Sequence, residues 1–413
     1  MSTTFYPVLT LPPEITGQFF LYCIPVPSSP YAHLSFAWIR YSWEDYKQKL
    51  PQAAPPPWDY PLSQVCRSWR GIALDTPALW AAFPLKASSL RSHHPSIESW
   101  LTRARDCPLT FTWSSSDIGE HMQQVLYSFQ DTAHWMGDVD LAMPIHEFEM
   151  MARSSVPWHF PVLQTLSLHV PDWCYSLQSP PVRVSAPLLR DLSTYGWNPE
   201  ACLFILSLTP KLLECRFSVF SEKGSWHTRP TPSPIPGTRV ALPHLHTLTL
   251  FGSYGPECEE AGHADILDYL TLPTLHTLKA FDLDPETDPC FLDAFLVRCT
   301  PPLRSLVLHK RGGTAIDVGV FGLMPELARL EIWRPSAEFM AVLAEDVFTP
   351  GGTRLALPQL QRLMLIGRLG SHESSASDVW EQGSWTGPWG EHDLIFLPFK
   401  TLTAEEVEVC IEG

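Results

Sequence analysis

The side chains best suited to chemistry in this sequence are a few histidines, and their spacing argues against a metal centre. His93–His94 and His244-x-His246 are the only close histidine pairs, and neither has a cysteine or carboxylate at zinc-ligand spacing. His146-Glu147 lacks the second histidine, four residues after the first, that a zinc-binding helix requires. We therefore expect no metal, and we interpret His244 and His246 as outward-facing loop or strand residues.

Two other clusters contain carboxylates, one of them together with a cysteine and a histidine. Cys258-Glu259-Glu260 with His263 could form a cysteine–histidine pair. Such a pair is reactive only if the two side chains meet in the folded protein, and this one falls in an expected loop. The acidic run at 282–288 could attract Ca²⁺, but Pro285 interrupts it, and the glycine and terminal glutamate of an EF-hand are absent. We interpret the run as a solvated acidic loop.

Sequence motifs of common enzyme classes are missing. The strings G-x-S-x-G, H-E-x-x-H and G-x-x-x-x-G-K-[ST] do not occur. We therefore expect no catalytic residue, no cofactor and no enzymatic activity. The alternative, an enzyme built on an α/β repeat frame, would require a deep pocket with converging ionisable groups.

Composition and charge narrow the classes of partner. Of 413 residues, 45% are hydrophobic, which allows a large core, and 41 are prolines spread along the chain. The 28 basic residues face 44 acidic ones, giving a net charge of −16 with no basic block. Nucleic acid and anionic membranes attract clustered Lys and Arg, so neither is an expected partner.

The start of the chain and its cysteines indicate an intracellular protein. The first six residues have no basic and no long apolar segment typical of a signal peptide. The apolar run at 201–208 is far shorter than the roughly 18 residues of a bilayer span. Ten cysteines are scattered singly, which fits free thiols in a reducing compartment, with cytoplasm and nucleus both open.

Three helices are predicted near the start of the chain. Leu11-Pro12-Pro13-Glu14-Ile15 opens one, because proline suits a first helical turn, and apolar residues continue it until Pro25. A second has apolar residues at helical spacing from Leu62 to Ala73. The segment 75–80, D-T-P-A-L-W, predicts a capped, short third helix.

These strings resemble the F-box, especially the form common in mushroom-forming fungi. The resemblance covers residues 9–83 and is carried by L-P-P-E-I at 11–15, V-C-R-S-W-R at 65–70 and T-P-A-L-W at 76–80. It implies a small all-α domain that docks on the adaptor subunit of an SCF-type, cullin-based ubiquitin ligase. By that resemblance, the candidates for the adaptor face, or for the small core behind it, are Leu11, Pro12, Ile15, Val65, Cys66, Trp69, Leu79 and Trp80.

A long insertion separates the two halves of this motif. It spans about residues 26–60 and contains Trp38, Trp43 and Trp58, so it is not a purely polar linker. Two interpretations stay open. The insertion could be a surface loop that leaves docking intact, or it could cover the docking face.

A repeated template follows. The pattern P-x-L-x-x-Φ-x-Φ, with Φ mostly apolar, recurs eight times, with successive prolines 23 to 33 residues apart. Counting the proline as position 0, leucines or other apolar residues stand at +2, +5 and +7. The prolines are Pro161, Pro187, Pro210, Pro243, Pro273, Pro301, Pro325 and Pro358. Alternate apolar residues predict a short strand, and helical patterns precede several of the prolines.

A helix–strand unit that cannot bury its own apolar face must stack on its neighbours. We therefore predict an α/β repeat solenoid of leucine-rich-repeat type, with parallel strands and outer helices, after the F-box domain. Its expected parts are degenerate capping repeats at 90–160, the array at 161–369 and an irregular C-terminal segment at 370–413.

The residues at +8 should face away from the leucines at +5 and +7. They are His169, Tyr195, Ser218, Phe251, Phe281, His309, Trp333 and Ile366. A largely aromatic row on a sheet face is typical of a protein-binding surface, and Phe251, Phe281, His309 and Trp333 are the first candidates for target binding. The alternative is that loops cover the row.

The sequence therefore predicts a subunit that recruits a protein substrate to an SCF-type ligase, binding the adaptor through its N-terminal helices and the target through the array. The alternative is a repeat-based interaction scaffold whose F-box is vestigial and does not dock.

Overall fold

The computed structural model describes residues 11–23, 64–86, 99, 101–114, 132–143, 147–148, 158–170, 184–197, 199–219, 239–252, 263–283, 290–314, 318–335, 359–366 and 395–398. The chain divides into two compact units, unit 1 at Met1–Leu189 and unit 2 at Arg190–Gly413. No helix within the described ranges is long and apolar enough to cross a membrane. The domain boundaries expected from sequence stay predictions.

Unit 1 begins with three short helical elements: α1 (Pro13–Cys23), α4 (Arg67–Asp75) and the 3-10 helix η4 (Pro77–Trp80). The Cys66 thiol caps α4 by accepting from the Trp69 backbone N–H at 3.5 Å. Because Cys66 has an extended backbone, with φ of −158°, the expected helix from Leu62 to Ala73 is interrupted there. The predicted short third helix is confirmed in 3-10 form, with Pro77 in its first turn.

The α1–α4 pair packs around two aromatic side chains. Phe20 is fully buried, and its ring lies edge-on to Trp69, with ring centroids 5.1 Å apart. Gly17 lies close to Thr76, since a Cβ there would be 3.1 Å from the threonine hydroxyl oxygen. Trp80, also buried, donates its indole N–H to the Ala73 carbonyl at 2.9 Å. These contacts give the helices a small core of their own.

The sheet of unit 1 has four parallel strands in the order β1-β2-β3-β5. Their bounds are β1 Ala82–Lys86, β2 Leu109–Ser114, β3 Met136–Ala142 and β5 Thr165–His169. The strands predicted near 108–113 and 139–141 are confirmed as β2 and β3, whereas β1 was not predicted. The 3-10 helix η5 (Ala133–Trp135) precedes β3, and two-residue strands β4 (Trp158–His159) and β6 (Val184–Ser185) pair with each other.

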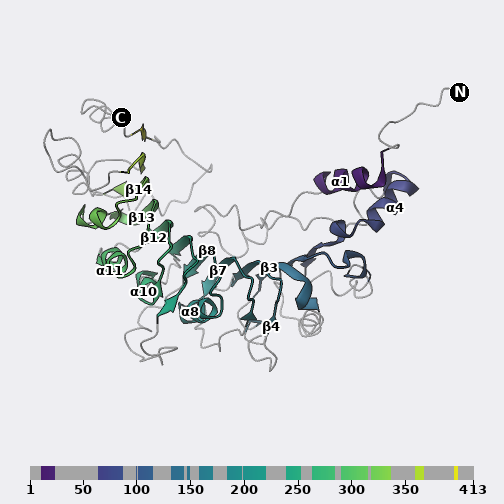
Figure 1. Cartoon of the computed structure of the whole chain (residues 1–413), viewed down its shortest axis with the longest axis horizontal. Helices are drawn as coiled ribbons and strands as arrows, with labels where there is room; N and C mark the ends of the chain where they lie inside the picture. Colours follow the sequence, from purple (N-terminus) through teal and green to yellow (C-terminus); the bar gives the residue numbers. More distant parts are fainter. Residues whose placement is uncertain are drawn as a thin grey trace, which may run out of the picture. The chain divides into compact units, whose positions relative to one another are not determined.

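Unit 2 contains a large parallel sheet in the order β7-β8-β10-β12-β13-β14-β15 (Figure 1). The bounds are β7 Asp191–Trp197, β8 Glu214–Val219, β10 Thr247–Gly252, β12 Thr277–Leu283, β13 Ser305–Thr314, β14 Arg329–Pro335 and β15 Arg362–Ile366. A last strand, β16 (Ile395–Pro398), pairs antiparallel with β15. The predicted α/β class with parallel strands is therefore correct.

Short helices connect the strands of unit 2. They are α8 (Pro199–Ser207), α10 (His263–Asp268), α11 (Cys290–Cys299) and the 3-10 helix η6 (Val318–Leu323), and two-residue strands β9 (Val240–Ala241) and β11 (Leu270–Thr271) pair with each other. In Figure 1, α8, α10 and α11 lie on the same side of the strands. Of the helical patterns predicted before the template prolines, the one before Pro273 is wrong at its end, because Leu270 belongs to strand β11 and not to a helix.

The template positions explain the core. The leucines at +2 are fully buried in seven copies: Leu163, Leu189, Leu212, Leu245, Leu275, Leu303 and Leu327. The residues at +5 and +7 are also buried wherever their side chains are described, as the alternation predicted. In six copies the carbonyl of the residue before the proline accepts from the +2 N–H at 3.0–3.4 Å. Each of these prolines thus occupies the second position of a β-turn, where its fixed φ is favoured.

A backbone ladder links successive units of the template. In unit 2 the carbonyl at +3 accepts from both the +3 and +4 N–H groups of the next copy, at 2.8–3.1 Å. The series runs from Arg190 through Leu213, His246, His276 and Arg304 to Ala328. Because the side chains at +3 differ while the bonds repeat, the ladder depends on backbone geometry alone.

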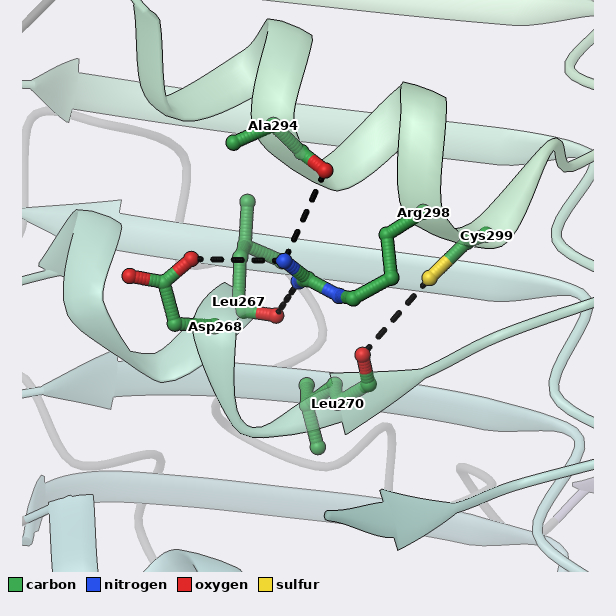
Figure 2. Close-up of polar contacts among 6 residues, drawn as sticks. All are labelled: Leu267, Asp268, Leu270, Ala294, Arg298 and Cys299. Carbon is green, nitrogen blue, oxygen red and sulfur yellow. Dashed lines mark hydrogen bonds and ion pairs between the residues drawn. The ribbon is translucent and has the colours of Figure 1, made fainter. Parts of the chain in front are cut away.

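Figure 2 shows how α11 is tied to α10. The Arg298 guanidinium donates to the Leu267 carbonyl and lies 3.5 Å from the Asp268 carboxylate. The Cys299 thiol donates to the Leu270 carbonyl at 3.6 Å. A cation at the C-terminal end of α10 complements the negative end of its dipole. This cluster has a structural role.

Several expected elements lie outside the described residues. They are the insertion at 26–60 with its tryptophans, the helical pattern at 339–343, the loop at 370–393 and the strand expected at 407–411.

Candidate protein-binding surfaces

The exposed side of α1 is apolar. It carries Ile15, Phe19 and Tyr22, which follow helical spacing and are 52%, 44% and 88% exposed, and Leu11, two residues before the helix, is 39% exposed. We call these four side chains the α1 face. On the opposite side, Thr16 and Phe20 are buried, so one helix has one side for the core and an apolar side left open. Four large apolar side chains on one face form a patch typical of an interaction site.

The eight predicted adaptor-binding residues separate into two groups. Leu11, Pro12, Ile15 and Val65 are exposed, and Cys66 is half-buried. In contrast, Trp69, Leu79 and Trp80 are buried in the core. Phe19 and Tyr22 belong to the α1 face but are not among the predicted adaptor-binding residues. The spacing of both with Ile15 was the signal that placed them on one surface.

The +8 residues of unit 2 form stacked aromatic contacts across the strands. The ring of Phe251 stacks on Phe281 with centroids 5.3 Å apart and on Tyr195 at 6.2 Å. Tyr195 and Phe251 reach each other although β8 lies between their strands, because β8 contributes the small Ser218 at this position. Farther along, the rings of His309 and Trp333 lie 5.6 Å apart. We call these six side chains the +8 row.

Burial differs along the +8 row. Ser218 and Phe251 are buried, whereas Tyr195, Phe281, His309 and Trp333 are half-exposed. Three of the four target-binding candidates, Phe281, His309 and Trp333, therefore present part of their rings to solvent. The side chain of Ile366 lies outside the described residues.

Charged side chains share this face of the unit 2 sheet at +4 and +6. Glu214 and Arg216 on β8 form an ion pair at 2.9 Å. On β14 the Glu331 carboxylate accepts from Arg329 at 2.7 Å and from the indole N–H of Trp333 at 2.9 Å. Glu331 is buried, so these two bonds fix its carboxylate and orient the Trp333 ring.

The corresponding face in unit 1 is polar and closed. Its +8 residue, His169, is buried, and its Nε2 atom lies 3.5 Å from the Asp140 carboxylate. Burial lowers the pKa of His169 well below its usual value, because the charged imidazolium loses solvation. On the neighbouring strand Thr110 donates its hydroxyl to Asp138 at 3.2 Å. A neutral imidazole held between strands in this way fits a structural role.

The histidines singled out by the sequence lie just before strand β10, at the start of α10 (His263) or outside the described residues. His244 and His246 are exposed, as predicted, and the His246 ring lies 5.2 Å from that of His276. Within the described ranges, no group of three or more metal-ligating side chains occurs. His93–His94, His146, Cys258 and most of the acidic run after Asp282 lie outside those ranges.

Comparisons with known proteins do not assign this chain to a family. No family model matches this sequence, and no curated protein matches it.

Proposed function

We propose that this chain is a substrate-recruiting F-box subunit of an SCF-type, cullin-based ubiquitin ligase. Its N-terminal helices bind the adaptor subunit, and through it the cullin. A leucine-rich-repeat-like solenoid binds the protein target. The chain itself has no active site and works by proximity in an intracellular compartment, while the ligase supplies the chemistry.

The α1 face is the observation that carries the proposal. An apolar helix face with exposures of 39–88% gains free energy when a partner covers it, at about 25 cal/mol per Å² of apolar area. It lies in the segment whose residues resemble the F-box, and Trp69, Leu79 and Trp80 form the core behind it. A preformed, rigid helix pair also keeps the entropic cost of docking low.

The repeat assignment has separate support. The parallel strands follow in chain order, the +2 leucines are fully buried, and the +3 carbonyl ladder repeats from copy to copy. A stack in which each unit contacts its neighbours through the same bonds is the organisation expected of a solenoid.

Adaptor capture tests the proposal. The full chain, tagged and co-expressed with a fungal SCF adaptor subunit, should capture the adaptor, and Ile15→Asp should reduce capture at least about tenfold. Leu188→Asp is the matched control, because Leu188 is an exposed leucine of unit 1 outside the helices, at 44% exposure. It should capture the adaptor normally.

Two outcomes would contradict the adaptor-binding role. If the folded wild-type chain captures no adaptor, the scaffold with a vestigial F-box is favoured. If Ile15→Asp and Leu188→Asp capture equally well, the α1 face is not the docking surface.

A further inference from the structure

Stacking of the template copies brings together two histidines that lie far apart in the sequence. His246 and His276 occupy position +3 of successive copies, each one residue before its strand, β10 or β12. Because these strands pair in parallel, with Thr247 opposite Thr277, the two histidines are neighbours at the start of the sheet. The centroids of their rings lie 5.2 Å apart. No spacing rule within one segment identifies this pair, because it exists only after stacking.

The separation of the two rings fits two bonds to one metal ion. Imidazole nitrogen binds Zn²⁺ at about 2.0–2.1 Å, which puts the centroids of two rings on a tetrahedral ion roughly 5 Å apart. The observed 5.2 Å agrees with that value, and the ring planes are inclined at 69°. Because His246 is exposed and His276 is half-exposed, rotation about their side-chain bonds can aim one nitrogen of each ring at a shared ion.

Backbone hydrogen bonds hold the two histidines at this spacing. The His246 carbonyl accepts from the His276 N–H at 2.9 Å, and the His246 N–H donates to the Leu213 carbonyl at 2.8 Å. The His276 carbonyl in turn accepts from the Arg304 N–H at 2.8 Å. Since the backbone is fixed at both residues, only side-chain rotations are lost when an ion binds, which keeps the entropic cost of binding low.

The surrounding charges allow a bound cation. Arg304, at +3 of the following copy, acts on His276 as a positive charge, but the Arg304 guanidinium lies 3.5 Å from the Glu326 carboxylate. That carboxylate acts on His276 with the opposite sign and offsets part of the repulsion. The chain as a whole has a net charge of −16, which attracts cations.

We propose that His246 and His276 form a binding site for a divalent transition-metal ion such as Ni²⁺, Cu²⁺ or Zn²⁺, for which imidazole is a preferred ligand. Within the described part of the chain, no third metal-ligating side chain joins the pair, so water fills the other coordination positions. The bound ion joins two successive copies of the template at the edge of the sheet. The site goes beyond the proposed function and does not depend on it.

Metal-dependent stability of the purified full chain, free of any histidine tag, tests the proposal. An ion that binds only the folded site raises the urea concentration at which the chain unfolds. Ni²⁺ is the probe, because the chain has ten cysteines and soft thiolates select Zn²⁺ and Cu⁺. Mg²⁺, which prefers oxygen ligands, controls for a general effect of cations on an acidic chain. At about pH 8, where histidine is neutral, NiCl₂ should raise the urea midpoint and MgCl₂ should not.

Variants locate the site. In His246→Gln and in His276→Gln, the Ni²⁺ concentration needed for a given rise in the urea midpoint should increase at least about tenfold, because the remaining imidazole loses a second ligand held at high effective concentration. His134→Gln is the matched control, since it removes an exposed histidine of unit 1 and should leave the Ni²⁺ response unchanged. Circular dichroism checks folding, and His246→Gln changes the more exposed side chain of the pair.

The proposal is overturned if the folded wild-type chain gains no stability from Ni²⁺ or gains as much from Mg²⁺. An equal loss of response in His134→Gln would also overturn it, because the ion would then bind single histidines adventitiously. If His246→Gln and His276→Gln respond like the wild type, the two rings only stack edge to face. None of these results involves an adaptor or a protein target, so a failure here is distinguishable from a failure of the ligase proposal.

Discussion

The α1 face and the +8 row are both apolar, but they relate differently to the fold. The α1 face is open, with Ile15 at 52% exposure, while the core is made by the opposite side of the same helix. In the +8 row the rings stack on one another, and Phe251 at its centre is only 8% exposed. The exposed part of the α1 face is thus available to a partner, whereas the stacked rings of the +8 row contribute to the stability of the sheet.

This difference teaches that an apolar pattern alone does not define a binding residue. A side chain can be replaced without cost to folding only where the fold does not use it. Substitutions that separate stability from binding therefore test the comparison directly.

The largest effect is expected inside α1, between two adjacent phenylalanines. Phe20→Ala should lower the free energy of unfolding of unit 1 by about 3–5 kcal/mol, because it removes a fully buried ring from its contact with Trp69. Phe19→Ala, at 44% exposure, should cost about 0.5 kcal/mol or less. Urea unfolding followed by tryptophan fluorescence measures both, and similar losses would remove the distinction between the two sides of α1.

The next effect concerns the +8 row. Phe251→Ala should cost about 3 kcal/mol, because the residue is buried between Tyr195 and Phe281. Phe281→Ala should cost about half as much, because that ring is half-exposed. Thermal unfolding of the two variants gives the values. A loss at Phe251 no greater than that of Ile15→Ala would mean that the +8 row is as independent of the fold as the α1 face.

Much of the sheet could be predicted from sequence because its signal is periodic. A proline, a leucine at +2 and apolar residues at +5 and +7 each have one geometric role. The structure keeps the proline turn in six copies and buries the +5 and +7 residues wherever their side chains are described. The two-residue strands β9 and β11 could not be predicted, since two residues contain no period. They form because the parallel pairing of Val240 with Leu270 satisfies backbone groups between neighbouring copies.

The candidate surfaces were predictable only in outline. Phe19 and Phe20 are the same residue type at successive positions, and only the position of α4 decides which one is buried. In the +8 row, the burial of Phe251 depends on Ser218 being small enough for Tyr195 to reach across β8. Gly196, with φ of 75°, then shifts the register of β7, so that Trp197 returns to the core. In these cases the burial of a residue depends on side chains of neighbouring strands, so no pattern within a single segment of the sequence reveals it.

A smaller, pH-dependent effect is expected at the buried +8 residue of unit 1. Because burial lowers the pKa of His169 in the folded state, the unfolded state binds the proton more readily. Stability should therefore be full above about pH 6.5, the unfolded value, and should fall below it by up to about 1.4 kcal/mol per pH unit. His169→Gln should flatten this dependence.

The matched control for His169 is His134→Gln, which changes an exposed histidine of unit 1. It should leave the slope between pH 7 and pH 5 unchanged in urea titrations. If His169→Gln also leaves it unchanged, the buried imidazole does not control the acid sensitivity of unit 1, and its role on the closed face is steric.

The smallest effect compares two basic residues on the same face of unit 2. Arg329→Gln should cost about 1 kcal/mol, because the buried Glu331 carboxylate loses its closest donor and keeps only the Trp333 indole. Lys279→Gln should change stability by less than about 0.5 kcal/mol, since it breaks no ion pair among the described residues. Chemical denaturation resolves this difference if both variants are measured against the wild type in parallel. A lysine that stabilises the fold as much as Arg329 does would have a partner within the chain.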